Sequence, residues 1–185
     1  MYHMKKWLFV LLAVVFFAFV HEGAHAFTAF AYKEYESFHV RPIGLEVVFK
    51  TPISERNGVK WGIISGSGNL LTLAIGYLLL AFRQRISRLQ NVFARSMGYW
   101  IILLFLIGDA LNLSIGTFLY GGDANGIAVG FNIGRYTVQL IFLVLFVINR
   151  ELVAQMLLPT FGITTSHPLI RPWMKITPNI IHEKP

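Results

Sequence analysis

The sequence contains no cysteine and few charged residues. With no cysteine among its 185 residues, the chain can form neither a disulfide nor a thiolate metal site, so a zinc site must use histidine and carboxylate ligands. Only 14% of the residues are charged and 55% are hydrophobic, whereas soluble domains carry about 25% charged residues. The composition therefore predicts an integral, multi-pass protein of a cell or inner membrane, surrounded by the lipid bilayer.

Acidic residues are also scarce, at nine against sixteen basic residues, which gives a formal net charge of +7. The basic residues flank apolar segments, as they do in membrane proteins whose orientation they fix, so the charge does not indicate nucleic-acid binding. The link at residues 83–95 carries four arginines and no acid. The positive-inside rule favours a cytoplasmic position for this link and for both termini.

Four long apolar segments are present, and each approaches or exceeds the roughly 20 residues that cross a bilayer. They cover about residues 7–31, 61–82, 96–119 and 122–148. The first is too long for a cleaved signal peptide. We expect an all-α membrane protein of about four transmembrane helices, with a helical domain at residues 1–149 and an irregular, proline-rich tail at residues 150–185.

A short strand is expected between the first two apolar segments. Residues 43–49 alternate between apolar and other side chains, although Val48 breaks the pattern. The alternation predicts a strand that forms a hairpin with residues 59–64 across Asn57-Gly58. An interfacial loop is the alternative interpretation.

The most informative motif is an H-E-x-x-H sequence at residues 21–25, inside the first apolar segment. Histidines four residues apart project from one face of a helix, so His21 and His25 can hold one zinc ion while Glu22 serves as general base. An ionisable group costs about 2.5–3.5 kcal/mol at the bilayer centre, which favours a functional role. The alternatives are a polar patch that lines a lumen, or histidines satisfied by neighbouring helices.

The only two aspartates, Asp109 and Asp123, are the candidates for a third ligand. The first segment leaves the membrane just after His25, and the second enters on the same side and reaches Asn69 at a depth of about 12 Å. The third segment ends, and the fourth begins, on that side as well. Connectivity therefore predicts that His21, His25, Asn69 and both aspartates share one layer of the membrane.

Glycine recurs every four residues at positions 122, 126, 130 and 134. On a helix these glycines form a smooth stripe that lets another backbone approach closely. We expect the stripe to bring the fourth segment against the histidine-bearing helix, so that Asp123 reaches the metal. Ordinary packing of small residues, with no metal nearby, is the alternative.

In three places the chain resembles the site-2 protease family of intramembrane zinc metalloproteases, in particular its small branch that lacks a peptide-binding domain. Residues 21–25 match the family's zinc motif, and Ser-Gly-Ser-Gly-Asn-Leu at 65–70 looks like its glycine-rich segment. Asn112 followed by residues 121–125 looks like its Asn-to-Asp-Gly segment. Gly122 and Ala124, however, stand where the family often has proline and glycine. The likeness covers roughly residues 7–135.

The resemblance implies a protease that cleaves membrane-embedded protein substrates with a zinc held by His21, His25 and Asp123. Glu22 would be the general base, and Asn69 would hydrogen-bond the substrate or the developing oxyanion. The strand near residues 43–49 would hold an unwound substrate by edge pairing. A non-catalytic metal-binding membrane protein, either a regulator or a metal carrier, is the alternative, although a pure binding site needs no base at Glu22.

Overall fold

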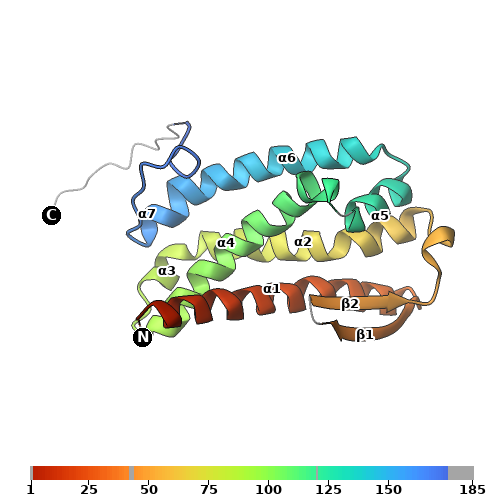
Figure 1. The fold of residues 1–185 in the computed structure, drawn as a ribbon, viewed down its shortest axis with the longest axis horizontal. Coiled ribbons are helices and arrows are strands. Elements are labelled where there is room, and N and C mark those ends of the chain that lie inside the picture. Colours follow the sequence, from red (N-terminus) through yellow and green to blue (C-terminus); the bar gives the residue numbers. More distant parts are fainter. Residues whose placement is uncertain (1, 42–43, 120, 175–185) are drawn as a thin grey trace.

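In the computed structural model, which describes residues 2–41, 44–119 and 121–174, the chain is mostly helical. Four helices long and apolar enough to cross a membrane run side by side and alternate in direction (Figure 1). They are α1 (Tyr2–Ala31), α2 (Val59–Ala81), α4 (Val92–Ser114) and α6 (Arg135–Leu152). This confirms the predicted number of apolar helices.

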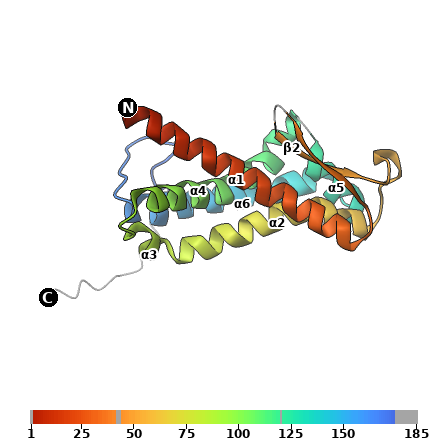
Figure 2. The ribbon, with the colours of Figure 1, turned by 90° about the horizontal axis from the view of Figure 1, so that it is seen from below.

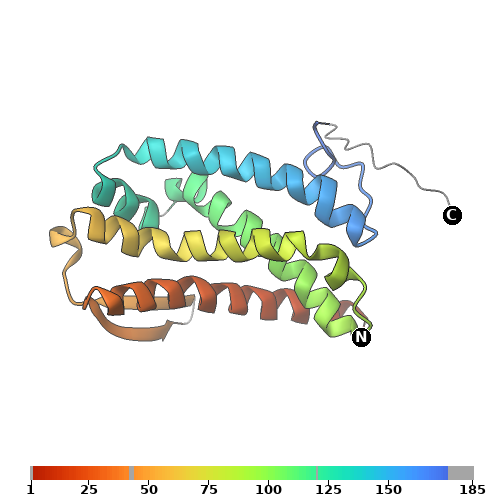
Figure 3. The same ribbon diagram turned by 180° about the vertical axis from the view of Figure 1, so that it is seen from behind.

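The connecting elements divide the bundle into two different ends. The short helix α3 (Arg83–Ser87) joins α2 to α4 at the end where α1 begins (Figure 3). The opposite end carries a hairpin of β1 (Tyr35–Arg41) and β2 (Gly44–Phe49), together with the ten-residue helix α5 (Gly122–Phe131). Short 3₁₀ turns at Ile53–Glu55 and Gly116–Phe118 complete that end.

The predicted strand at residues 43–49 is confirmed, but its predicted partner is wrong. Strand β2 pairs antiparallel with β1, which places Phe38 opposite Val47. Phe38 stacks on Phe19 of α1 with ring centroids 6.3 Å apart, so the hairpin lies back along α1 (Figure 2). Residues 59–64 instead open helix α2, because an apolar run of that length satisfies all its backbone hydrogen bonds as a helix.

The fourth predicted segment, residues 122–148, is two helices rather than one. Helix α5 ends at Asn132, which adopts a left-handed conformation with φ 51°. The Ile133 N–H then donates to the Ala128 carbonyl at 2.9 Å, a bond typical of a helix terminus. The fourth helix able to cross a membrane is therefore Arg135–Thr160, and α5 stands apart from it.

The last helix also runs further than the sequence suggested. Helix α6 passes into a π-helical turn, Val153–Leu157, and then into α7 (Leu158–Thr160). The wider π turn ends two residues before Pro159, whose nitrogen has no hydrogen to donate. Irregular structure thus begins after residue 160 rather than at residue 150.

The glycine stripe was predicted to pack against the histidine-bearing helix, but it packs α5 against α2 instead of α1. A Cβ at Gly126 would lie 2.6 Å from the Ser65 Cβ, and one at Gly130 would lie 3.0 Å from the Trp61 carbonyl carbon. Gly134 falls outside α5. The aspartate at the start of α5 is therefore positioned through α2.

Buried apolar side chains hold these elements together in three clusters. One joins α2 and α4 to the last turns of the chain's final helix, one joins α4, α5 and α6, and one joins α1, α2 and the hairpin. Many outward-facing apolar side chains stay exposed, including Phe27 (76%) and Leu70 (72%). Such a surface suits contact with lipid better than contact with water.

Candidate metal centre

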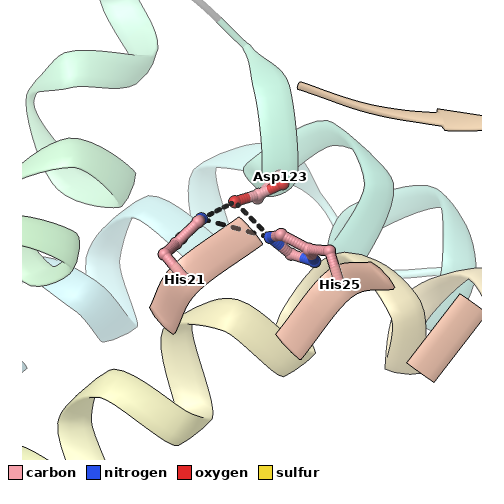
Figure 4. Close-up of side chains that lie close together, drawn as sticks. All are labelled: His21, His25 and Asp123. Atoms are coloured by element: carbon pink, nitrogen blue, oxygen red, sulfur yellow. Dashed lines mark hydrogen bonds and ion pairs between the residues drawn. The ribbon is translucent and has the colours of Figure 1, made fainter. Parts of the chain in front are cut away.

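Two helices bring three metal-ligand side chains together at the hairpin end of the bundle. Helix α1 contributes His21 and His25, which are 9% and 4% exposed, and α5 contributes Asp123 (Figure 4). The Nε2 atoms of the two histidines are 3.1 Å apart. Asp123 Oδ2 lies 3.1 Å from His21 Nε2 and 3.4 Å from His25 Nε2. Three ligand atoms thus form a nearly equilateral triangle.

The size of this triangle suits a metal ion. A tetrahedral zinc with bonds of about 2.0–2.1 Å places its ligand atoms about 3.3–3.4 Å apart. The three observed separations lie within about 0.3 Å of that value. The group of His21, His25 and Asp123 could therefore hold a metal ion without rearrangement.

The Nδ1 atoms of both histidines form hydrogen bonds outside the triangle, and these bonds orient the two rings so that their Nε2 atoms face its centre. His25 Nδ1 lies 2.7 Å from the Ile64 carbonyl oxygen, which can only accept a hydrogen bond. His21 Nδ1 lies 3.1 and 3.2 Å from the two carboxylate oxygens of Asp109. Both Nδ1 atoms consequently carry the hydrogen, and in the neutral rings both Nε2 lone pairs point at the centre.

Two nitrogen lone pairs and a carboxylate oxygen cannot lie this close together without a positive charge among them. Protons on the imidazoles or a metal ion would each supply it. Burial alone favours the neutral form of Asp123, but the contacts with His21 and His25 hold the pKa of its carboxyl below the usual range. A lowered pKa favours the ionised carboxylate, which is the form that binds a metal ion.

The structure separates the two aspartates that the sequence left as candidates. Asp109, only 1% exposed, lies on the Nδ1 side of His21, away from the centre. It also accepts a hydrogen bond from Thr72 Oγ1. A carboxylate in this position orients a metal-binding imidazole and raises its basicity. Sequence reasoning missed Thr72, although it follows Asn69 by three residues and so shares its helix face.

Asn69, which the resemblance implied as a substrate-binding residue, lies next to the candidate metal centre. Its side chain is 1% exposed and is not part of the cavity wall. Asn69 Nδ2 donates to Asp123 Oδ2 at 3.2 Å and to the Ser65 carbonyl at 3.3 Å. The structure thus places Asn69 behind Asp123, where it can orient that carboxylate.

A cavity of about 780 Å³ opens onto the centre. Glu22 is half-buried and lines it, with its carboxyl group near the backbone amide of Val47 on β2. Five consecutive residues of β2, Leu45–Phe49, form one wall, and α2, α4 and α5 contribute others, including Asn112. The cavity therefore brings together the side chains of the candidate metal centre, the Glu22 carboxyl group and strand β2.

Comparisons with protein-family models, with curated proteins and with solved structures find no significant match to this chain.

Proposed function

We propose that the chain is an integral, multi-pass membrane protein that acts as an intramembrane zinc metalloprotease. The observation that carries the proposal is the triangle of His21, His25 and Asp123 beside the carboxyl group of Glu22. Three ligands of this kind leave the fourth position of a tetrahedral zinc open, which is typical of catalytic rather than structural sites. The four apolar helices support the membrane setting.

A bound zinc ion supplies Lewis acidity, which activates water and polarises a peptide carbonyl. Glu22 follows His21 in the chain and lines the same cavity, so its carboxylate can accept the proton of the attacking water. The same carboxyl can then deliver that proton to the nitrogen of the leaving amine. Asp109 and Asn69 hold His21 and Asp123 in position from outside the cavity.

The substrate class follows from the position of β2. Only one edge of β2 is paired, with β1, in the described sheet, and five of its six residues, Leu45–Phe49, line the cavity. An extended peptide can add to such an edge through backbone hydrogen bonds. A substrate helix must unwind before its carbonyl carbon is accessible, so strand pairing next to Glu22 supports cleavage of unwound segments of membrane proteins.

The proposal is tested by measuring zinc and cleavage in the same preparations. Purified protein should contain one zinc per chain, and His21→Ala should lose it. Glu22→Gln should keep the zinc but cleave single-span substrates about 100-fold more slowly or worse. Glu55→Gln, which removes an exposed carboxyl outside the cavity, should retain both. Zinc binding without cleavage across a broad substrate panel would instead support a non-catalytic metal-binding membrane protein.

A further inference from the structure

Among the described residues that line the cavity, Arg56 is the only lysine or arginine. It lies in the loop between β2 and α2, and its guanidinium carbon is 4.7 Å from the ring centre of Phe49 and 4.9 Å from that of Trp61. Its Nε donates to the Thr51 carbonyl at 2.9 Å. Two rings and one hydrogen bond therefore hold the guanidinium in place.

No carboxylate of the described chain pairs with this guanidinium. The nearby Glu34 accepts hydrogen bonds from Lys60 Nζ at 2.5 Å and from Thr51 Oγ1 at 2.7 Å, and these bonds hold its pKa below the usual range. Burial lowers the pKa of Arg56, and the negative charge of the nearby Glu34 offsets this lowering only in part. Arg41, by contrast, pairs with Glu46 at 2.7 Å. Arg56 is thus a half-buried cation that forms no direct ion pair within the described chain, and the carboxylate of Glu34 that attracts it is already bonded to Lys60 and Thr51.

We propose that Arg56 is a specificity-determining residue that binds an aspartate or glutamate side chain of the substrate. This inference rests on the proposed function. Its Nε is already bonded, and the two terminal nitrogens remain for a carboxylate, which a guanidinium binds in bidentate fashion. Arg56 contacts Phe49, the last residue of β2. A peptide paired with the β2 edge passes Arg56 as it runs from the metal centre toward the loop.

The charge of the cavity agrees with an acidic side chain at this position rather than elsewhere. Glu22 and Asp123 lie at the metal centre, so a substrate carboxylate beside either of them meets a like charge, whereas Glu46 on β2 is already paired with Arg41. Arg56 offers the opposite charge within the same cavity. The substrates selected by this residue have an acid a few residues from the cleaved bond, on the side that faces the loop.

The test uses fluorescent single-span peptides that carry one glutamate at successive positions beyond the span, each matched with a glutamine version. Binding is measured to the zinc-loaded Glu22→Gln protein in neutral detergent, so that no peptide is consumed. At one position the glutamate peptide should bind about tenfold more tightly than its partner. Arg56→Gln should abolish that preference and Arg56→Lys should reduce it. Arg85→Gln, which removes an arginine that also lies over a ring, at the opposite end of the bundle, should preserve it.

Equal binding of glutamate and glutamine peptides at every position would overturn the inference, as would a preference that survives Arg56→Gln in protein with normal zinc content. Equal binding that weakens when anionic phospholipid is added would assign Arg56 to a lipid headgroup instead. Peptides with a free or an amidated carboxyl terminus are compared in parallel, and a preference for the free terminus alone also refutes it. Cleavage by the unmodified chain is measured separately. A protein that cleaves no peptide but shows an Arg56-dependent binding preference would contradict the proposed protease activity and leave the role of Arg56 in binding supported.

Discussion

Gly68 of α2 lies against both histidines of the candidate metal centre, and this close packing yields a prediction. A Cβ at this position would lie 2.6 Å from His25 Nε2 and 2.9 Å from the His21 carbonyl oxygen. Ordinary contacts between such atoms are about 3.5 Å, so Gly68→Ala requires a displacement of about 0.9 Å. The His25 ring cannot simply turn away, because Ile64 holds its other nitrogen.

A metal–nitrogen bond tolerates a displacement of only about 0.2 Å. We therefore expect Gly68→Ala to weaken zinc binding by about 10- to 100-fold, measured by competition with a chelator of known affinity. Helix formation itself should not suffer, since alanine favours a helix by about 1 kcal/mol over glycine. Gly66→Ala is the matched control, because its Cβ would meet only Ile127, at 3.8 Å. Zinc affinity that is unchanged in Gly68→Ala would show that α2 can shift without disturbing the histidines, and the reasoning would fail.

Three further predictions concern the ligands, the packing of α5 and the loop charges. Asp123→Ala should lose zinc, whereas Asp109→Asn should lower zinc affinity by only about 10- to 100-fold. Full zinc content of Asp123→Ala, measured by elemental analysis, would exclude Asp123 as a ligand. Gly126→Leu should separate α5 from α2 and abolish zinc binding and cleavage. The four helices should still insert in the membrane, and protease-protection mapping can verify this insertion. Normal zinc affinity in that variant would rule out the packing role of Gly126. Because Lys60 lowers the pKa of Glu34, this ion pair should stabilise the protein at a pH above the ordinary glutamate pKa, and the stabilisation should be lost as the pH falls through the lowered pKa. The melting temperature of Lys60→Met should therefore depend less on pH than that of the unmodified protein. An identical pH dependence would show that the pair does not contribute to stability.

The features that the sequence predicted well are those set by local physics. A long apolar run has to satisfy its own backbone hydrogen bonds, so the four helices follow from composition alone. A spacing of four residues places His21 and His25 on one face whatever surrounds them. The closeness of both histidines to Asp123 agrees with the connectivity, which needs only the order and direction of the helices.

The errors arose where a decision depended on distant parts of the chain. The break at Asn132 was missed because apolar residues continue on both sides of it, and one asparagine in a left-handed conformation is a weak signal. The predicted depth in the membrane could not separate Asp109 from Asp123, because connectivity predicts the same layer for both. What separates them is the side of the His21 ring that each one faces, and this depends on how α4 and α5 are rotated. The positions of Asn69 and Arg56 depend on packing in the same way.

The ligands come from distant parts of the chain, since His21 and Asp123 are 102 residues apart. A protein that enters the membrane helix by helix during synthesis presents both histidines long before the carboxylate arrives. A metal ion at this centre would bind the assembled bundle far better than the inserted but unassembled helices, and its binding free energy would add to that of assembly. The supply of metal would then control how many newly made chains complete their assembly, and chelation during synthesis would reduce the yield of assembled protein.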